Sequence, residues 1–293
     1  MAAVICGSLA FDTIMNFEGR FAQQILPEQL HILNVSFLVP ALRRDFGGCA
    51  GNIAYALKLL GGDPLPMATL GSDGAGYLER LGTLGIATEF VRQIDDAYTA
   101  QAMIMTDLDN NQITAFHPGA MMQAHRTRIE ARPDIRLGII SPDGRDAMLE
   151  HAQQFHAAGI PFVFDPGQGL PMFDGAELAS FIAQASWVTV NDYEGKMLCE
   201  RTGWSIAEIS RRVRALVVTL GGDGCEVWID GERTHVPAVP ARDIVDPTGC
   251  GDAWRGALLF GLEQGWSLAR CAELGNRVGA IKISSRGPQN YTL

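Results

Sequence analysis

The 293-residue sequence lacks several features that would assign it to other classes of protein. Its six cysteines form no Cys-x-x-Cys pair, so we expect reduced thiols and neither a structural zinc site nor a disulfide framework. No apolar run approaches the roughly 20 residues that a membrane helix requires. The amino terminus has no basic segment before its short apolar stretch, which argues against an export signal. These absences predict a cytoplasmic protein with no membrane partner.

Basic residues are also scarce, because 23 lysines and arginines stand against 33 aspartates and glutamates. No basic block interleaved with aromatic residues occurs, so we expect no nucleic-acid partner. Internal repeats and low-complexity linkers are absent as well. The hydrophobic share of 47% is typical of a globular protein long enough to bury one large core. We therefore predict a single domain spanning residues 1–293.

What the sequence does contain, from about residue 138 onward, is strand-length apolar runs that alternate with helical patterns. Four of these runs finish at Ser141, Asp165, Asn191 and Gly221. Such alternation predicts an α/β fold with a mainly parallel central sheet covered by helices on both faces. Ligands of these sheets bind beyond the carboxyl ends of the strands, which is where the four residues lie.

The segment before residue 120 has a different character. A short strand, "AVICGS", and a helix, "GNIAYALKLLGG", are joined by half-exposed segments of alternating polarity. These segments are "FDTIMNFEG", "LHILNVSFLV", "TAQAMIMTDLDN" and "NQITAFHPGA", with a hairpin turn at "DNN". We expect them to form strands of a small β-lid, inserted from roughly residues 11–46 and 96–120.

The stretch "DPTGCGDAWRGALL" at 246–259 places a glycine-rich turn before a mostly apolar helix. The first N–H groups of a helix have no intrahelical partners and carry a partial positive charge. Because Gly249, Cys250 and Gly251 have little bulk, a phosphoryl group could approach these N–H groups as in an anion hole. Asp252 could then accept a proton from an attacking hydroxyl. The alternative is a simple strand-to-helix turn that Asp252 caps.

Together with "GGCAGNIAYALKLLGG" at 47–62, this stretch resembles the two signatures of the ribokinase-like family of carbohydrate and nucleoside kinases. The resemblance extends from about Ala3 to Gly287. It implies a three-layer ribokinase-like sandwich, ATP as co-substrate and Mg²⁺ as cofactor. It also implies that Asp252 is the catalytic base and that Gly249, Cys250 and Gly251 supply the anion hole. Cys250 departs mildly from the small residue that the family usually has there.

For the substrate, the resemblance points to the N-terminal third of the chain. Asp12 falls where the family grips substrate hydroxyls, and Asn16 is expected to join it. Gly48 would let a substrate ring lie against the backbone, while the Asn52 amide could serve two adjacent hydroxyls. A dinucleotide-binding loop is the alternative, but the glycine spacing here is not Gly-x-Gly-x-x-Gly.

For the nucleotide, "NDYEGKML" matches the Asn-x-x-Glu element of the family. Asn191 and Glu194 are expected to order the water shell of Mg²⁺, although a helix-capping box is the alternative. Asn191 is further expected to contribute to the ATP site. The other residues that the resemblance places beside ATP are Thr219, Gly221, Gly224 and, at the adenine, Asn276. Plain core packing is the alternative for Asn276.

The texture of "FEGRFAQQILPEQLHILNVSFLV" is similar to bacterial adenosine kinases of this family. Phe116 could stack on a purine, and Gln112 and Gln168 could bond a base edge; packing within the lid is the alternative for Phe116. We therefore predict transfer of the ATP γ-phosphoryl group to the 5′-hydroxyl of a purine ribonucleoside such as adenosine, inosine or guanosine.

Three other functions compete with this one. The first is a sugar kinase of the same family, acting on ribose, fructose or a related acid. The second is a catalytically silent nucleoside sensor, which the intact Asp252 and glycine turn disfavour. The third is a nicotinamide oxidoreductase, which the missing dinucleotide motif disfavours. Sheet edges in the lid further suggest a homodimer formed through the lid strands.

Overall fold

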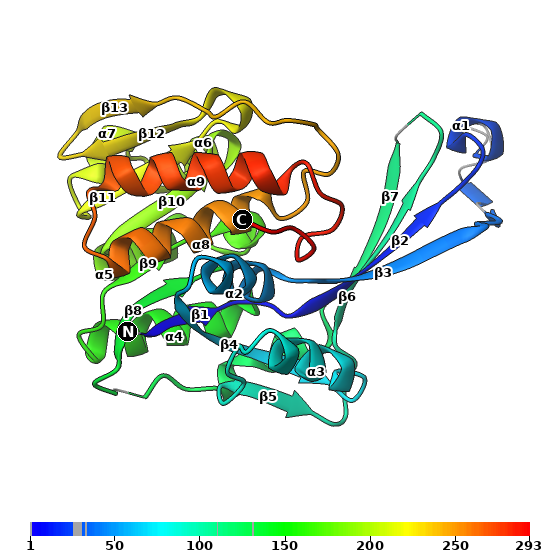
Figure 1. Cartoon of the computed structure of the whole chain (residues 1–293), viewed down its shortest axis with the longest axis horizontal. Helices are drawn as coiled ribbons and strands as arrows, with labels where there is room; N and C mark the ends of the chain where they lie inside the picture. The colour runs from blue at the N-terminus through cyan, green and yellow to red at the C-terminus, as the bar shows by residue number, and fades with distance from the viewer. Residues whose placement is uncertain (1, 26–30, 33, 110, 131) are drawn as a thin grey trace.

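The computed structural model describes residues 2–25, 31–32, 34–109, 111–130 and 132–293, which form two sheets and the helices around them. Figure 1 shows the smaller sheet projecting from one end of the larger α/β body. Among the described residues, no helix combines the length and the apolar character needed to cross a membrane.

The larger sheet has nine strands. Their bounds are β1 Ala2–Cys6, β4 Asp63–Gly71, β5 Val91–Ile94, β8 Ile135–Ile140, β9 Phe162–Phe164, β10 Trp187–Asn191, β11 Ala215–Thr219, β12 Cys225–Ile229 and β13 Glu232–Val236. Their spatial order is β13-β12-β11-β10-β9-β8-β1-β4-β5. The strands from β5 to β11 run parallel, and only the β12 and β13 edge is antiparallel. Because β1 lies between β4 and β8, the strand order reverses there, as at the ligand-binding crevice of open α/β sheets.

Helices cover both faces of this sheet. On one face lie α2 Cys49–Leu59, α3 Ala75–Thr83, α8 Cys250–Glu263 and α9 Leu268–Lys282. On the other lie α4 Arg145–Ala157, α5 Gly175–Gln184, α6 Asp192–Thr202 and α7 Ile206–Ser210. The short elements are α1 Phe21–Gln24 and the 3₁₀ turns η2 Gly119–Arg126, η3 Gly167–Met172 and η4 Gly221–Asp223. The predicted α/β three-layer sandwich is confirmed.

Strand β1 shows why two cores form. Successive side chains of a strand point to opposite faces. Accordingly, Ala3 and Ile5 pack in the core under α2 and α8, whereas Val4 and Cys6 pack in the core under α4. An apolar run without polar interruption is therefore what a strand covered on both faces requires.

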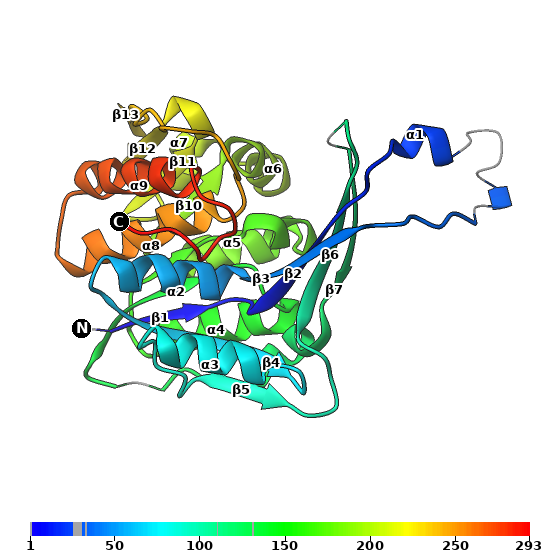
Figure 2. The same cartoon turned by 45° about the vertical axis from the view of Figure 1, so that its right-hand side comes forward.

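The smaller sheet consists of β2 Ala10–Asn16, β3 Ala41–Gly47, β6 Ala100–Thr106 and β7 Gln112–His117, in the order β3-β2-β6-β7. Figure 2 shows it rising away from the α/β body, with α1 at its far end. A smaller β-sheet is present as predicted, although one of its strands lies elsewhere, and the division into a single domain with two insertions stays a prediction.

One lid strand was predicted in the wrong place. Residues 34–40 form no strand, and the other described residues of "LHILNVSFLV" form none either; the strand is "ALRRDFG" at 41–47. The apolar run misled because Phe37 packs against the rings of Phe17 and Phe21, while Leu38 is exposed. The true strand has three consecutive charged residues, so polar and apolar residues do not alternate along it. One of its faces carries Leu42, Arg44 and Phe46, a charged side chain between two apolar ones.

Candidate active site

Several of the predicted site residues lie at the carboxyl edge of the large sheet. Asn191 and Thr219 end neighbouring strands and face each other in the β10–β11 register. Helices α2 and α8, which begin after Gly48 and Gly249, pack side by side against this part of the sheet. The lid projects from the same end of the body (Figures 1 and 2).

The turn before α8 has the geometry that an anion hole needs. Gly249 is the N-cap with φ of 78°, a left-handed conformation, and a Cβ there would lie 2.6 Å from the Pro288 side chain. The N–H of Cys250 donates to the carbonyl of Pro247 at 3.2 Å. Within the described part of the chain, the N–H groups of Gly251 and Asp252 donate to no protein acceptor. These two donors are therefore the ones open to a ligand, whereas the N–H predicted at Cys250 is already engaged.

Asp246, at the start of the same turn, ties it to the lid and to the C-terminal segment. Its carboxylate accepts from the N–H groups of Thr248 and Gly287, both at 2.9 Å. Arg43 of the lid lies 3.5 Å away, and Lys282 donates to the Asp246 carbonyl at 2.8 Å. The backbone before the anion hole is therefore held from three sides.

Asp252, in the first turn of α8, is a partly buried carboxylate with one strong partner. Asn52 Nδ2 donates to Asp252 Oδ2 at 2.8 Å. Burial raises the pKa of Asp252 to about 6, although the Asn52 hydrogen bond and the Arg255 charge act in the opposite direction. At neutral pH the carboxylate is therefore mostly ionised and able to accept a proton.

Asn52, whose binding to substrate hydroxyls stays a prediction, has two side-chain partners in the protein. Besides donating to Asp252, its Oδ1 accepts from Gln289 Nε2 at 3.0 Å, and Gln289 also donates to the Tyr77 hydroxyl at 2.8 Å. The amide expected to serve two substrate hydroxyls is thus engaged at both ends by the protein. In this arrangement Asn52 orients Asp252, and the sequence analysis missed Gln289 altogether.

Asp12 lies on β2 directly opposite Asp45 of β3. Any side chain at Gly47 would collide with the Asp12 carboxylate, so the glycine makes room for the acid. Burial, followed by the charges of Asp45 and Asp252, raises the pKa of Asp12 to about 6. A buried carboxylate with a second carboxylate opposite it suits a site that binds hydroxyl groups, because hydroxyl donors can hydrogen-bond to its oxygens.

The lid register sorts the other substrate candidates into two rows on one face. Asp12 pairs with Ala102, which pairs with Phe116; Asn16 pairs with Thr106, which pairs with Gln112. Phe116 is therefore two strands from Asp12, about 10 Å away, and its ring is 53% exposed. Asn16 and Gln112 lie about 13 Å farther along the strands. Asn16 consequently does not join Asp12 on the same hydroxyls, which corrects that expectation.

On the nucleotide side, the capping interpretation of the Asn-x-x-Glu element is confirmed. The Asn191 side chain accepts from the N–H of Glu194 at 2.7 Å, and Glu194 accepts from the N–H of Asn191 at 2.8 Å. Thr219 ends the adjacent strand, followed by Gly221 in η4 and Gly224 with φ of 89°. Gly224 is buried against the Val236 backbone, whereas Gly221 is exposed.

The expected contact between Asn276 and adenine needs correction. Its Oδ1 accepts from the Trp254 indole at 3.0 Å, and its Nδ2 donates to the carbonyls of Val236 and Pro237 at 3.2 and 3.0 Å. The side-chain N–H groups and the oxygen of this buried amide thus all bind protein partners, which hold α9 against α8 and β13. The packing alternative describes this residue.

Asp165 and Arg255 form a pair that sequence reasoning missed. Arg255, three residues after Asp252, donates through Nε and Nη2 to the two Asp165 oxygens at 2.5 and 2.6 Å. Both residues are buried. An arginine within an otherwise apolar helix was the available signal, since such a charge requires a buried partner. Gln168 follows in η3, with an exposed side chain at the same edge of the sheet.

The residues expected to lie near a metal offer a carboxylate and an amide. In the ranges described, no group of three or more His, Cys, Asp or Glu side chains could hold a metal ion. The carboxylate of Glu194 is the hard oxygen donor nearest to Asn191, and Mg²⁺ usually keeps several of its waters. The residues present therefore fit an Mg²⁺ ion held mainly by phosphates, with Glu194 and Asn191 contacting its water shell.

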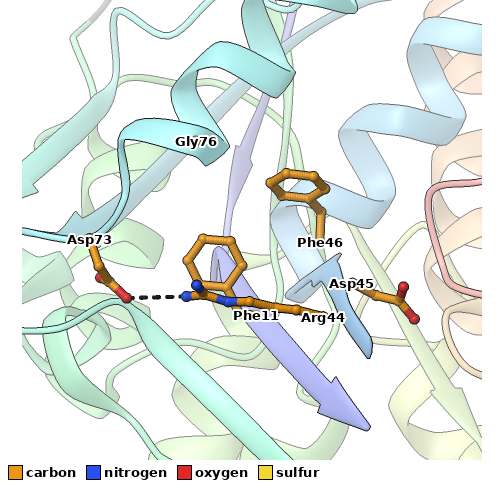
Figure 3. Close-up of a pocket in the computed structure, with 6 residues that line it drawn as sticks. All are labelled: Phe11, Arg44, Asp45, Phe46, Asp73 and Gly76. Carbon is orange, nitrogen blue, oxygen red and sulfur yellow. Dashed lines mark hydrogen bonds and ion pairs between the residues drawn. The ribbon is translucent and has the colours of Figure 1, made fainter. Parts of the chain in front are cut away.

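A separate hollow of about 340 Å³ lies on the opposite face of the lid strands, and Figure 3 shows its lining. The Arg44 guanidinium lies 3.6 Å from the centre of the Phe11 ring and 3.2 Å from the Asp73 carboxylate. The Asp45 side chain points away from these groups in Figure 3, toward the Asp12 face. The contacts of Arg44 with Phe11 and Asp73 hold the root of the lid. The lining of this hollow includes none of the predicted site residues.

Comparison with known proteins identifies a family and several similar kinases. The pfkB family of carbohydrate kinases matches residues 17–293. A nucleoside kinase from Methanocaldococcus jannaschii is 29% identical over 293 residues, which cover 99% of this chain and 93% of that protein. An aminoimidazole riboside kinase from Salmonella typhimurium is 28% identical over 85% of this chain and 86% of its own.

Solved structures agree with this assignment. A nucleoside kinase from Burkholderia thailandensis in complex with inosine is 54% identical, with a TM-score of 0.89 over 99% of this chain and 93% of that one. The same kinase in complex with ADP-inosine gives a TM-score of 0.87 over 99% and 92%. The resemblance seen in the two glycine-rich motifs is thus confirmed, and the chain belongs to the pfkB family of carbohydrate kinases.

Proposed function

We propose that the protein is a nucleoside kinase that transfers the γ-phosphoryl group of ATP to the 5′-hydroxyl of a purine ribonucleoside. The observation that carries this proposal is the juxtaposition of Asp252 with the free N–H groups at the start of α8. Asp12 and the exposed Phe116 ring lie on the lid face above them.

In the proposed reaction Asp252 accepts the proton of the 5′-hydroxyl as the new O–P bond forms, while the bond from the γ-phosphorus to the bridging oxygen of ADP breaks. The N–H groups of Gly251 and Asp252 stabilise the charge on the equatorial phosphoryl oxygens. Asp12 holds ribose hydroxyls, and Phe116 stacks on the base once the lid closes. Closure excludes water, which suppresses ATP hydrolysis.

The similar kinases support this acceptor. The Burkholderia thailandensis enzyme binds inosine, and its other complex contains ADP-inosine, so a purine nucleoside and an adenine nucleotide occupy that protein. At 54% identity, the same acceptor class is the most economical assignment for this chain. The other proposed contacts are Gln112, Gln168 and Gly48 for the nucleoside and Thr219, Gly221 and Gly224 for ATP.

ATP and Mg²⁺ complete the proposed site. Mg²⁺ would supply charge neutralisation across the ATP phosphates, and Glu194 and Asn191 would hold its water shell. Burial raises the pKa of Glu194, and Asp165 adds to the shift. A divalent cation nearby would favour the ionised carboxylate.

A sugar kinase is the second candidate, because relatives with similar identity include a mouse ribokinase at 27% over 84% of this chain. The discriminating experiment is an acceptor panel at fixed ATP, with inosine, adenosine, guanosine, cytidine, ribose and fructose. We expect kcat/KM for a purine nucleoside to exceed that for ribose by at least about 100-fold, because only the nucleoside gains the stacking contact and the base hydrogen bonds. Preferential phosphorylation of free ribose or fructose would overturn the proposal.

A further inference from the structure

We propose that Arg255 is a positioning residue for phosphoryl transfer, which orients and polarises the peptide group between Gly251 and Asp252. This inference rests on the proposed function in one respect, namely that the start of α8 receives the γ-phosphoryl group. Arg255 lies in the second glycine-rich motif, where it has no predicted role, and its contact with the Gly251 carbonyl is what assigns it this part.

The guanidinium of Arg255 is locked in place. The residue is only 6% exposed, and its fork binds both oxygens of Asp165, which follows β9. Two parallel hydrogen bonds from a planar guanidinium to a carboxylate fix the orientation of both groups. The remaining nitrogen, Nη1, is thereby aimed at the carbonyl of Gly251, to which it donates at 3.2 Å.

Fixing that carbonyl also fixes a donor of the anion hole. In a planar trans peptide the C=O of residue 251 and the N–H of residue 252 point in opposite directions. Helix α8 already directs the Gly251 carbonyl along its axis, and the hydrogen bond from Arg255 reinforces this direction and that of the Asp252 N–H, one of the two free donors. A charged donor on the carbonyl also polarises the peptide and makes its N–H a stronger donor. Arg255 thus acts on the transferring group through the backbone, without touching it.

The same guanidinium reaches toward the element proposed for the Mg²⁺ water shell. Arg255 Nη2 lies 4.0 Å from Glu194 Oε2, and Glu194 is held by Asn191. One side chain therefore links the end of β9, the start of α8 and the start of α6. A displacement of any one of these three elements would therefore change the contacts that Arg255 makes with the other two.

Stability alone gives little reason for such a pair. Replacing a buried ion pair by neutral side chains of similar volume is often neutral or stabilising, because the desolvation cost of both charges disappears. Asp165 shows that cost, since burial raises its pKa even though Arg255 lies beside it. The Asp165–Arg255 pair therefore has a functional rather than a stabilising role, because it lies beside the N–H groups at the start of α8.

The test is the double variant Arg255→Gln with Asp165→Asn, which keeps neutral hydrogen-bonding groups and removes both charges. We expect kcat to fall about 100-fold, as for loss of one oxyanion donor, while the nucleoside KM and its equilibrium Kd change less than about twofold. Arg214→Gln is the control, because Arg214 lies over Trp187, outside the site, and should leave kcat unchanged.

A folded double variant with wild-type kcat, or one that loses activity through KM alone, overturns the inference. If the double variant does not fold, Arg255→Lys decides by the same kcat and KM criteria, because lysine keeps the charge but not the fork. The wild-type acceptor panel separates this test from the proposed function. If the wild type phosphorylates only sugars, the proposed function fails, and the Arg255 test is run with the preferred sugar.

Discussion

At the scale of single residues, the site depends on carboxylates that the fold holds away from water. Asp252 and Asp12 both have a pKa near 6, because burial disfavours their charged forms. Both need to be ionised for the proposed reaction, Asp252 to accept a proton and Asp12 to accept hydrogen bonds. Ionisation of these two carboxylates therefore lowers the stability of the folded protein at neutral pH.

This titration predicts the pH dependence of catalysis. Below about pH 6 the ionised fraction of Asp252 falls, so kcat/KM should drop about tenfold per pH unit, and more steeply where Asp12 titrates too. The measurement is a pH–rate profile from pH 5 to 8 at saturating ATP. A profile that stays flat down to pH 5 would contradict the assignment of Asp252 as the proton acceptor.

We expect removal of the Asp252 charge to lower the activity and to raise the stability of the protein. The folded pKa of Asp252 lies above its ordinary value of 3.8, so its ionisation costs stability at pH 7, and this cost disappears as the pH falls toward 4. Asp252→Asn should therefore raise the free energy of unfolding at pH 7 by roughly 1–3 kcal/mol and lower kcat by about 1,000-fold or more. Thermal melts at pH 7.5 and pH 4.5 check this, with Asp146→Asn, an exposed acid, as the matched control. A lower melting temperature for Asp252→Asn at pH 7.5 would show that the carboxylate is not strained by burial.

At the scale of elements, the root of the lid is held by one acid. Asp73 Oδ1 accepts from the N–H of Thr99, just before β6, at 2.7 Å, and its Oδ2 pairs with Arg44 of β3. These bonds hold the pKa of Asp73 below its usual value despite burial, so the anchor persists at neutral pH and is lost only in strong acid. The exposed ion pair contributes little by itself, whereas the backbone bond contributes more.

Loosening this anchor should show in the coupling of the reaction. Asp73→Ala frees both lid strands at their base, so we expect the nucleoside KM to rise about threefold to tenfold. Water would also reach the phosphoryl group more often, so ADP release would exceed nucleoside monophosphate formation. Parallel assays of both products measure this ratio, with Asp146→Asn as control. A ratio of one with unchanged KM would show that the Arg44–Asp73–Thr99 contacts do not control the lid.

The elements were predictable where local pattern and burial agreed. The runs that became β1 and β8 to β11 are mostly apolar because helices cover both faces of the sheet, although β8 carries an exposed Arg136. Strand β3 escaped prediction since neither of its faces is fully buried and its middle is charged. Apolar character alone misplaced it at 30–39, where side chains such as Leu38 stay exposed.

The contacts inside the site were less predictable. Asn52 bonds Asp252 across 200 residues and Gln289 across 237, and Arg255 meets Asp165 across 90. No local pattern in the chain records such pairings, because they arise only when helices and strand ends meet. The motifs predicted some of the residues that gather at the starts of α2, α6 and α8, but not which of them would bind each other.

At the scale of the whole molecule, the outer part of the lid has a second face that no described segment covers, whereas the root of that face packs on Tyr77 and Asp73. By the strand register, Leu42, Met15, Met103 and Ile113 lie on the face opposite Asp12. Leu42 is 63% exposed, and Met103 and Ile113 about 40%. Contiguous apolar faces of this kind are usually covered by another protein surface.

We therefore predict a homodimer paired through this lid face. Met103→Glu should shift the protein from dimer to monomer in sedimentation or light scattering, since the charge would be buried at the contact. Glu79→Ala, on the outer surface of α3, is the control. A wild-type protein that stays monomeric at high micromolar concentration would refute the dimer.

The central claim is that the start of α8 and Asp252 together handle the phosphoryl group during transfer. A crystal structure with inosine, ADP, Mg²⁺ and aluminium fluoride, a mimic of the transferring group, tests it most directly. We expect fluoride within about 3.2 Å of the N–H groups of Gly251 and Asp252, and the 5′-oxygen within about 3 Å of the Asp252 carboxylate. A fluoride complex bound away from residues 249–252, or a 5′-hydroxyl turned away from Asp252, would contradict it.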